Sequence, residues 1–568
     1  MKTQLLFLFF LIFHSFTNAQ ETVIMSEIMY GIDHNKKLIV SNENVNGINS
    51  DFPNTKSAIS LDVNYTFSSP VQTLETGVSY QVINSSNNQI YILYFTELPL
   101  IYISTVDEIV DAPKVWASFT LTESNGNSIS SDIGIEVRGG YSQIFPKKSF
   151  EIKFWEDNSG DESVDVSLLG MRTDSDWNLQ AMYNEPLRFL SKNNNDLWRL
   201  FHTTHYTDEE PEAVNGIKMT YSEMFLNGEY RGVYAVSEKI DRKQLKLKKH
   251  NGSIRGELYK GDQWGNGAVT FSWLGPYNND SDVWDGFEYK HPKEEIDWSN
   301  LYNLIDFVKN SNNNEFYAQY QNKFQLDNMV DYFIFLNLLR ATDNTGKNIY
   351  IAKYDTEEPY FYVPWDLDGT FGIIWSGNHE NITNDILRNK LYDRLLQDCS
   401  VNGFREKLRD RWNSAKQSIF NHDFLMNKFQ ESYDYLSENG VYQREEIAWT
   451  NYHTEHYHLD YMSNWINNRL AYLDTKFNES CPDANVSDVE MTKIEIYPKP
   501  TSDYLYFNYT ENLSLMISVY DMQGKKLLEQ KIENSDQRLN VSALSAGTYI
   551  IKIKTDQAIQ TEKIIISK

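Results

Sequence analysis

Apolar and polar residues alternate over much of the first half of the chain, and this period of two is typical of β-strands. Residues 21–97 read as short strands separated by Asn, Ser and Gly turns, as in GVSYQVINSSNNQIYILYF. They predict either a small β domain or extended strands that lead into the next region. From residue 98 the pattern predicts antiparallel strands of one sheet, in LPLIYIST, KVWASFTLTE, IGIEVRGG and KKSFEIKFW.

Helical spacing appears first in EPLRFLSKNNNDLWRLF (185–201). Strands then return in YSEMFLNGEYRGVYAVSEKI, where Asn227-Gly228 is a strong hairpin signal. From about residue 297 helices dominate, for example in WSNLYNLIDFVKN, LDNMVDYFIFLNLLR and VNGFREKLRDRWNSAKQSIF. One hairpin, NIYIAKYDTEEPYFYVPW, is embedded among these helices. The pattern therefore predicts an α+β chain, β-rich first and α-rich second.

The end of the chain has a different character. CPDANVSDVEM (481–491) is polar and poor in helix formers, so it predicts a linker. Beyond it, alternating segments and the hairpin glycines Gly524 and Gly547 predict a small all-β sandwich.

The first residues, MKTQLLFLFFLIFHSFTNAQ, have the pattern of a secretory signal peptide. Lys2 supplies the positive start, Leu5–Phe13 the apolar core, and Thr17 and Ala19 the small residues before a cut at Gln20. The apolar core is too short to span a bilayer, and no later stretch approaches the required length of roughly 18 apolar residues. We therefore expect the mature chain to leave the cytoplasm.

Composition narrows the choice of partners. The chain has 52 basic and 79 acidic residues and a formal net charge of −27, which argues against nucleic acid as a ligand. Cys399 and Cys481 are the two cysteines of the sequence. They could pair in an oxidising compartment, but the sequence does not give their distance, so it leaves their pairing open.

Candidate chemistry lies around the embedded hairpin. Asp343 and Asn348 form a D-x4-N loop after an apolar helical stripe, and Asp366 and Asp368 form a D-x-D-G turn directly after the second strand. Protein kinases have the same local order, with a catalytic Asp, an Asn ligand and a second Asp that holds magnesium. The alternative is that these residues cap turns, or that DLDG is a calcium loop.

An ATP site also needs cations that face the phosphates. In FPKKSFEIKF, alternation places Lys148 on the same face as the apolar residues that follow it and Lys147 on the opposite face, so Lys148 is the better candidate. Arg138 and Arg188 are candidates for phosphate binding, and Glu238 for the wall of a nucleotide pocket. Each of these charged residues has a structural alternative, as a solvated edge residue or an ion-pair partner.

HTEHYH (453–458) has three histidines at plausible metal-ligand spacing. It falls beside a helix start and has no cysteine nearby. Surface or helix-capping histidines are therefore the preferred interpretation.

Taken together, these segments resemble the CotH kinase family of secreted or spore-coat atypical protein kinases over roughly residues 98–476. The resemblance rests on the order of EVRGGYSQIFPKKSFEIKF, LLGMRTDSDWNLQAMYNEPLR, LNGEYRGVYAVSEKI, LYKGD, VDYFIFLNLLRATDNTGKNIYIAKY and VPWDLDGTFG, after LPLIYIST. It implies a two-lobed, protein-kinase-like fold that binds ATP with Mg²⁺ or Mn²⁺ between a β-rich N-lobe and an α-rich C-lobe.

The resemblance assigns roles to individual residues. It implies that Asp343 is the catalytic aspartate, that Asp366 and Asn348 bind metal with Asp368 beside them, and that Lys148 binds phosphate. The chain departs from the family at RGGYS (138–142), where Arg-Gly-Asn-Ser-Ser is common, and at the residue after Arg188. Tyr141 would crowd a phosphate in that turn.

The tail, with IEIYPKPTSDYL, SVYDMQGKKLLEQKI and LSAGTYIIKIKT, is similar to the C-terminal sorting domain of the type IX secretion system of Bacteroidota. That likeness implies passage through the periplasm to the cell surface or the medium. The expected organisation is a signal peptide (1–19), an N-terminal β-rich region (20–97), a CotH kinase-like domain (98–480), a linker (481–490) and a sorting domain (491–568).

Two functions remain open from the sequence. One is transfer of the ATP γ-phosphoryl group to a Ser, Thr or other hydroxyl of an exported or surface protein. The other is a catalytically inactive, kinase-like surface adhesin or binding protein. A metal-dependent hydrolase with paired carboxylates is a weaker third interpretation, because it needs a further acid that the sequence does not locate.

Overall fold

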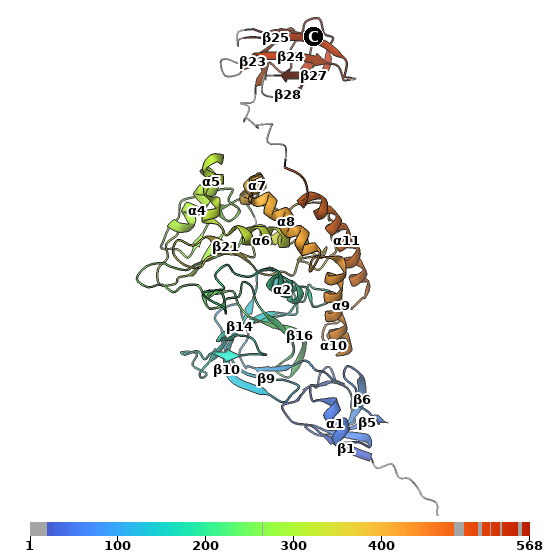
Figure 1. Ribbon diagram of the computed structural model, residues 1–568. Coiled ribbons are helices and arrows are strands. Elements are labelled where there is room, and N and C mark those ends of the chain that lie inside the picture. Colours follow the sequence, from blue (N-terminus) through green and yellow to red (C-terminus); the bar gives the residue numbers. More distant parts are fainter. Residues whose placement is uncertain are drawn as a thin grey trace, which may run out of the picture. The chain divides into compact units, whose positions relative to one another are not determined.

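A computed structural model describes residues 20–263, 265–481, 494–508, 514–522, 524–533, 537–554 and 559–568 (Figure 1). The predicted signal peptide lies outside the described residues, and so does nearly all of the predicted linker. The chain divides into two compact units, Met1–Glu479 and Ser480–Lys568. Within the described part of the first unit, a β-rich part precedes a helical part, as the hydrophobic pattern predicts.

Residues 20–97 form a mixed sheet around their own apolar core. Short strands suit these residues, since alternating apolar side chains are separated by turn-forming Asn, Ser and Gly. In spatial order the strands are β1 (Gln20–Ile24), β4 (Thr55–Ser60), β5 (Asn64–Val71), β6 (Ser79–Asn84), β7 (Ile90–Phe95), β3 (Leu38–Ser41) and β2 (Tyr30–Asp33). Helix α1 (Val45–Asp51) begins at Asn44, whose side chain accepts hydrogen bonds from the amides of Asn46 and Gly47.

The next strands close into a barrel rather than the single antiparallel sheet that the sequence predicts. In order around the barrel they are β10 (Ser128–Arg138), β11 (Ser149–Trp155), β14 (Asp176–Gln180), β16 (Glu229–Ser237), β15 (Met219–Leu226), β8 (Leu100–Ser104) and β9 (Val115–Thr122). Closure depends on a parallel pair between β8 and β15, which lie far apart in sequence. This pairing removes the free edges that an open sheet exposes. Two short strands, β12 (Val166–Ser167) and β13 (Thr173–Asp174), pair outside the barrel.

The helical part contains a further sheet. Its strands, in order, are β18 (Val283–Trp284), β19 (Phe287–His291), β17 (Glu257–Gly261), β20 (Ile349–Lys353) and β21 (Tyr360–Pro364). The helices are α2 (Leu190–Phe201), α3 (Arg242–Leu245), α4 (Ser299–Asn310), α5 (Asn313–Lys323), α6 (Leu326–Leu339), α7 (Lys390–Leu395), α8 (Phe404–Lys416), α9 (His422–Glu438), α10 (Val441–Ala448) and α11 (Tyr457–Phe477).

Helix α6 is the centre of the helical part. Every residue of α6 except Asp327 is buried. The sequence predicts one buried apolar stripe, whereas the helix is buried on all sides. It packs against α8 and α11 and against strand β21 of the hairpin that follows it. The loop at its C-terminus is therefore held between fixed elements.

Cys399 and Cys481 are both disulfide-bonded, and they are the only cysteines of the sequence, so they pair with each other. The sequence left this open. The bond ties the segment between α7 and α8 to the residues that follow α11.

The second unit is all-β among its described residues, as the sequence predicts. Strands β22 (Glu495–Tyr497), β23 (Tyr504–Asn508) and β26 (Leu539–Asn540) pair with one another. A second group pairs in the order β25 (Lys526–Ile532), β24 (Leu515–Tyr520), β27 (Gly547–Lys554) and β28 (Ile559–Ile566). Apolar side chains from both groups share one core, which is the arrangement of a β-sandwich.

Candidate active site

The loop after α6 is held by a buried amide that the sequence analysis did not single out. Asn344 lies in the 3₁₀ turn Thr342–Thr345 and is 3% exposed. Its Nδ2 donates to the carbonyls of Asn348 and Trp365, both at 2.8 Å, and its own carbonyl accepts from the Tyr332 hydroxyl at 2.7 Å. The neighbouring Asp343 is half-buried and is thereby placed at the open end of the β20–β21 hairpin.

Asn348 and Asp366 flank that open end from the two strands. Ile349 pairs with Pro364, and the amide of Trp365 donates to the Asn348 carbonyl at 3.0 Å. Both Asn348 and Asp366 have φ 54°, in the left-handed region that Asn and Asp tolerate better than most residues. Such backbone conformations cluster at functional sites, where the surrounding structure holds them.

Asp368 continues the acidic wall and is fixed by Asn184. The Asn184 Nδ2 donates to Asp368 Oδ2 at 2.6 Å and to the carbonyl of Trp375 at 2.8 Å. Burial raises the pKa of Asp368 well above its usual value, and the negative charge of Asp366 adds to this, while the Asn184 bond opposes it. A positively charged partner for these carboxylates would lower that electrostatic cost.

A cavity of about 570 Å³ gathers segments that are far apart in the sequence. Five residues predicted for the site line it, namely Arg138, Asp343, Asn348, Asp366 and Asp368. Further polar residues of its wall are Lys147, Asn184, Glu185, Lys260, Asp262 and Lys347. Lys260 and Asp262 belong to LYKGD, a matching segment in which the sequence analysis named no functional residue.

Arg138 lies where β10 ends and is half-buried. Its guanidinium donates to Gln180 Oε1 at 2.5 Å and lies 5.6 Å from the centre of the Trp365 ring. The contact with Gln180 orients the guanidinium, and the Trp365 ring belongs to the acidic side of the cavity. This agrees with the predicted position of Arg138 in the site, and its role there stays a prediction.

Lys147, and not Lys148, lines the cavity. Lys147 is 1% exposed and donates to the Val233 carbonyl at 2.6 Å and to Glu445 Oε1 at 2.7 Å. Lys148 instead donates to the carbonyl of Gln143 at 2.5 Å. The orientation predicted from alternation was wrong because β11 begins at Ser149, so neither lysine lies within the strand.

Arg188 is also buried away from the cavity wall. Its Nε donates to Glu445 Oε2 at 2.9 Å, and its NH1 donates to the carbonyls of Met182, Tyr183 and Glu185. Glu445 on α10 therefore neutralises both Lys147 and Arg188. Burial acts to raise the pKa of Glu445, but these two cations hold it below its usual value.

Burial lowers the pKa of Lys147 to about 7, and the positive charge of Arg188 acts in the same direction. The negative charge of Glu445 opposes this shift. Nothing in the local sequence points from Lys147 to Glu445, because 298 positions separate them. Pairs of this kind are visible only once the chain has folded.

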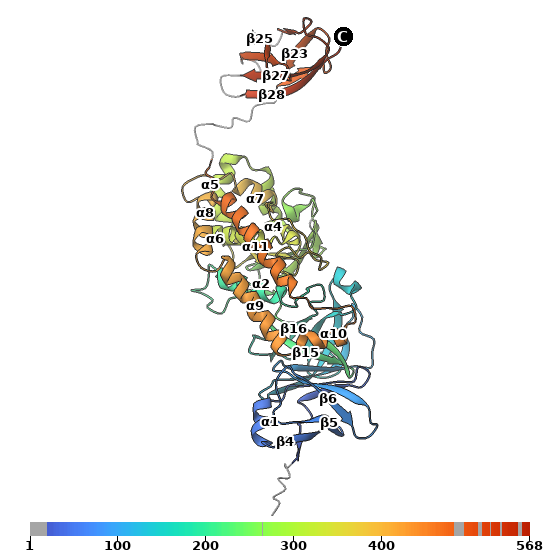
Figure 2. The ribbon, with the colours of Figure 1, turned by 90° about the vertical axis from the view of Figure 1, so that its right-hand side faces the viewer.

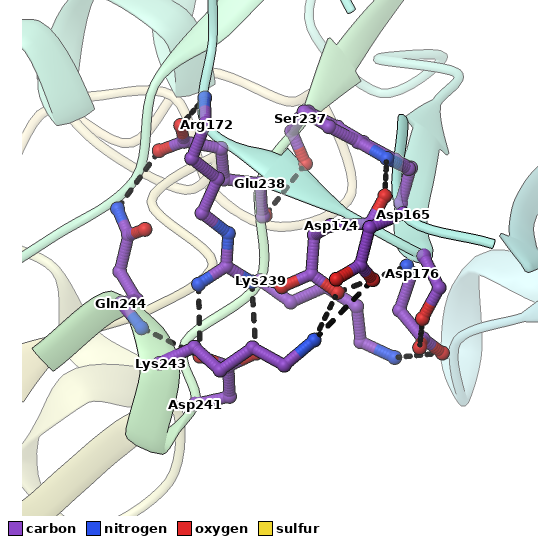
Figure 3. A network of polar contacts seen from close by, with 12 residues as sticks. Asp165, Arg172, Asp174, Asp176, Ser237, Glu238, Lys239, Asp241, Lys243 and Gln244 are labelled. Carbon is purple, nitrogen blue, oxygen red and sulfur yellow. Dashed lines mark hydrogen bonds and ion pairs between the residues drawn. The ribbon is translucent and has the colours of Figure 1, made fainter. Parts of the chain in front are cut away.

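Glu238 does not line the cavity, which corrects its predicted place there. It accepts from the amides of Arg172 at 3.1 Å and Lys218 at 2.8 Å, and from Gln244 Nε2 at 2.8 Å. Figure 3 shows it within a network in which Arg172 pairs with Asp241 at 2.8 Å. Glu238 thus joins the end of β16 to α3, so its hydrogen-bonding capacity is used for the fold.

Glu185 is a buried acid of the cavity wall that the sequence analysis missed. It is 1% exposed and accepts from the amide of Ser191 at 3.2 Å and from the Ser191 hydroxyl. Burial raises its pKa to about 7, although these hydrogen bonds lower it. A protonatable carboxyl group therefore faces the same cavity as Asp343, Asp366 and Asp368.

Tyr141 lies at the mouth of the cavity and is 52% exposed. Its ring is nearly perpendicular to the rings of Trp375 and Phe145, at 4.5 Å and 5.7 Å between ring centres. Tyr141 comes from the turn after β10 and Trp375 from the segment after Asp368. The two side chains thus meet across the entrance.

The histidine-rich segment lies elsewhere. His456 is exposed at the N-terminus of α11, while His458 Nδ1 lies 2.9 Å from Nε2 of His379. Burial lowers the pKa of His458 to about 4. The contact with His379 was not visible in the sequence, where the two residues are 79 positions apart.

Comparison with known proteins identifies the family of the chain. The family described as "CotH kinase protein" matches residues 135–473, more than half of the chain, so the chain belongs to the CotH family. A curated relative is "Inner spore coat protein H" of Bacillus subtilis (strain 168), which is 23% identical over 310 residues, covering 53% of this chain and 76% of that protein.

Residues 495–567 match the family described as "Secretion system C-terminal sorting domain". This match supports involvement of the type IX secretion machinery and a secreted or cell-surface location. Among the described residues, no helix has both the length and the apolar character needed to cross a membrane.

Proposed function

We propose that the chain is an exported protein kinase that transfers the γ-phosphoryl group of ATP to a hydroxyl side chain of an exported or surface protein. The observation that carries this proposal is the cavity of about 570 Å³, which is lined by Asp343, Asp366 and Asp368 together with Arg138 and Lys147. Phosphoryl transfer needs such a combination of positioning carboxylates and cationic groups. In this proposal the β-rich barrel is the N-lobe and the helical part is the C-lobe of a kinase-like fold.

The donor set on the acidic side fits a divalent cation such as Mg²⁺ or Mn²⁺. Asp366 and Asp368 offer carboxylate oxygens and Asn348 an amide oxygen, and these hard ligands suit Mg²⁺. Burial raises the pKa of Asp368 and the negative charge of Asp366 raises it further, and a bound cation would offset both effects. When bound together with ATP, the cation would supply charge neutralisation at the phosphates.

Side chains of the cavity would bind the phosphates, orient the acceptor hydroxyl and contact the purine base. Lys147 and Arg138 donate hydrogen bonds to phosphate oxygens, and Asp343 accepts the proton of the acceptor hydroxyl and orients it. Tyr183 and Trp365, whose rings line the cavity, offer an apolar surface for the purine base. Lys147 replaces Lys148 in this assignment because Lys147 is the lysine of the cavity wall.

The test uses the secreted protein and measures Mg-ATP binding by calorimetry together with phosphate transfer to itself or to a surface protein. Asp366→Ala is expected to lose the magnesium-dependent part of binding. Asp343→Asn is expected to keep binding and to lose transfer by at least about a hundredfold, the typical contribution of a positioned general base.

Lys147→Met and Lys148→Met form a matched pair. The first is expected to weaken nucleotide binding, and the second to leave it unchanged. Equal transfer by wild type, Asp343→Asn and Asp366→Ala would refute the proposal. Absence of any Mg-ATP binding at millimolar concentration would favour the non-catalytic surface-binding protein instead.

A further inference from the structure

Helix α10 presents two consecutive charged residues to two different buried partners. Glu445 faces the cavity side, where it pairs with Lys147. Arg444 faces the barrel, where its Nε donates to Glu223 Oε2 at 2.8 Å. Both Arg444 and Glu445 are fully buried. Since they share one short helix, whatever fixes Arg444 also fixes Glu445.

The N-terminal sheet supplies part of that fixation. The guanidinium of Arg444 lies 5.1 Å from the centre of the Tyr94 ring on β7. Asn439, in the turn between α9 and α10, accepts from the amide of Glu97 at 2.6 Å and from the Thr96 hydroxyl at 3.3 Å. The carbonyl of Asn439 in turn accepts from Arg444 NH1 at 2.8 Å. A continuous chain of contacts thus runs from residues 94–97 to Glu445.

Close backbone contact reinforces this chain. A Cβ added to Gly77 would lie 2.0 Å from the carbonyl oxygen of Glu438, and a Cβ added to Gly440 would lie 2.6 Å from the carbonyl oxygen of Gly77. The sheet therefore lies directly against the turn that begins α10. Ile447 and Ala448, at the end of the helix, pack on an apolar cluster shared by the sheet and the barrel. Figure 2 shows α10 beside β15 and β16.

Glu445 is equally constrained. A Cβ added to Gly232 would lie 1.9 Å from Glu445 Oε1, and Gly232 has φ 84°. The absence of a side chain there lets the carboxylate reach the amide of Val233, which donates to it at 2.7 Å. Glu445 therefore has a single well-defined position, and small shifts of α10 would break its bonds.

We propose that residues 20–97 act as a positioning element for the candidate active site, by holding the Asn439–Gly440 turn and Arg444 so that Glu445 keeps the Lys147 ammonium group in the cavity wall. The CotH match begins at residue 135, so it assigns no role to this sheet. The effect on phosphate binding rests on the proposed function, whereas the positioning of Lys147 is measurable without any nucleotide.

The test uses the full secreted chain and separates the N-terminal sheet from the turn before α10 with Gly77→Ala, because the added methyl group would overlap the Glu438 carbonyl. Gly252→Ala is the matched control, because Gly252 has a similar φ of 71° against 75° at Gly77 but nothing lies within 4 Å of its Cβ site. Hydrogen exchange is measured at the amides of Glu97 and Val233. Labelling of Lys147 by an amine-reactive anhydride is measured by mass spectrometry.

Gly77→Ala is expected to raise exchange at Glu97 and Val233 and labelling of Lys147 by about tenfold or more, the factor that follows from losing one good buried contact. Gly252→Ala is expected to match wild type. Exchange at Ile152 inside the barrel serves as the internal control, because it detects general unfolding and is expected to stay unchanged in both variants.

A second pair of variants tests the same contacts in case Gly77→Ala does not fold. Tyr94→Ala removes the ring beside Arg444 and is expected to loosen Val233 and Lys147, while Tyr94→Phe keeps the ring and is expected to restore wild-type values. Loosened Glu97 with unchanged Val233 and Lys147 would overturn the proposal. So would full protection of Glu97 in both Gly77→Ala and Tyr94→Ala, because the contacts would then not hold the turn.

Nucleotide binding separates this proposal from the proposed function. Increased Lys147 labelling together with several-fold weaker Mg-ATP binding supports both. Increased labelling in a protein whose wild type binds no Mg-ATP supports the positioning role and contradicts the kinase assignment.

Discussion

Replacement of Glu445 by Gln isolates the energetic role of one buried carboxylate. The wild-type carboxylate accepts hydrogen bonds from Lys147, from Arg188 and from the backbone amide of Val233. The side chains of Glu445, Lys147 and Arg188 are fully or almost fully buried. Gln keeps an oxygen for the Val233 amide but removes the counter-charge of two buried cations. Breaking a buried ion pair on one side costs about 3–5 kcal/mol, because the remaining charge stays desolvated and unpaired.

The two cations respond differently to that loss. Lys147 has a pKa of about 7 in the native protein, and Glu445 acts to raise this value, so Glu445→Gln leaves Lys147 largely neutral at pH 7.5. Arg188 cannot lose its proton. It keeps three carbonyl acceptors and lies 4.0 Å from the centre of the Tyr452 ring. We therefore expect a free-energy loss near 3 kcal/mol, the lower end of the range.

Urea unfolding followed by tryptophan fluorescence measures this loss. All 13 tryptophans precede residue 480, so the signal reports the first unit alone. Lys147→Met is expected to cost less than Glu445→Gln, because Glu445 then still pairs with Arg188. The double variant is expected to be more stable than the sum of the single losses by about 1–3 kcal/mol, as for residues in one network. A loss below about 1 kcal/mol for Glu445→Gln, or additive losses, would refute the reasoning.

Two further predictions concern the stability of the folded chain. The pKa of Glu185 is raised from 4.5 to about 7 in the native protein, so its stabilising contribution is full below pH 4.5 and is lost as the pH rises through 7. Glu185→Gln is expected to flatten the pH dependence of the urea midpoint between pH 4.5 and 7, and an unchanged slope would contradict this. The Cys399–Cys481 bond closes a loop of about 80 residues, which corresponds to about 4.5 kcal/mol in the chain-entropy account. The double Ser variant is expected to approach that loss in urea unfolding, and equal stability of oxidised wild type and variant would contradict it.

The hydrophobic pattern correctly indicated the order of elements, because periods of two and of three to four residues are local properties of the chain. The hairpin β20–β21 and the all-β second unit follow from alternation and turn residues in short segments. The barrel did not follow, because its closure depends on the pairing of β8 with β15, which lie more than a hundred positions apart.

The acidic half of the candidate site could be read from sequence for the same reason. Asp343 and Asn348 come just before one hairpin and Asp366 just after it, so local structure alone brings them together at its open end. Asn344, which locks this loop, stood between them and was overlooked because its contacts are to backbone carbonyls. An asparagine directly after a candidate catalytic aspartate is a signal that sequence reasoning can use.

The cationic half depended on tertiary structure. The orientation of Lys147 and Lys148 is decided by the start of β11 and by the position of Glu445, which reaches the cavity on a helix near the far end of the family match. By itself, the sequence determined the local elements, the acidic residues at the hairpin and the resemblance to a family. Only the folded chain decided which lysine is buried, since a charge can be buried only where distant residues supply its partner.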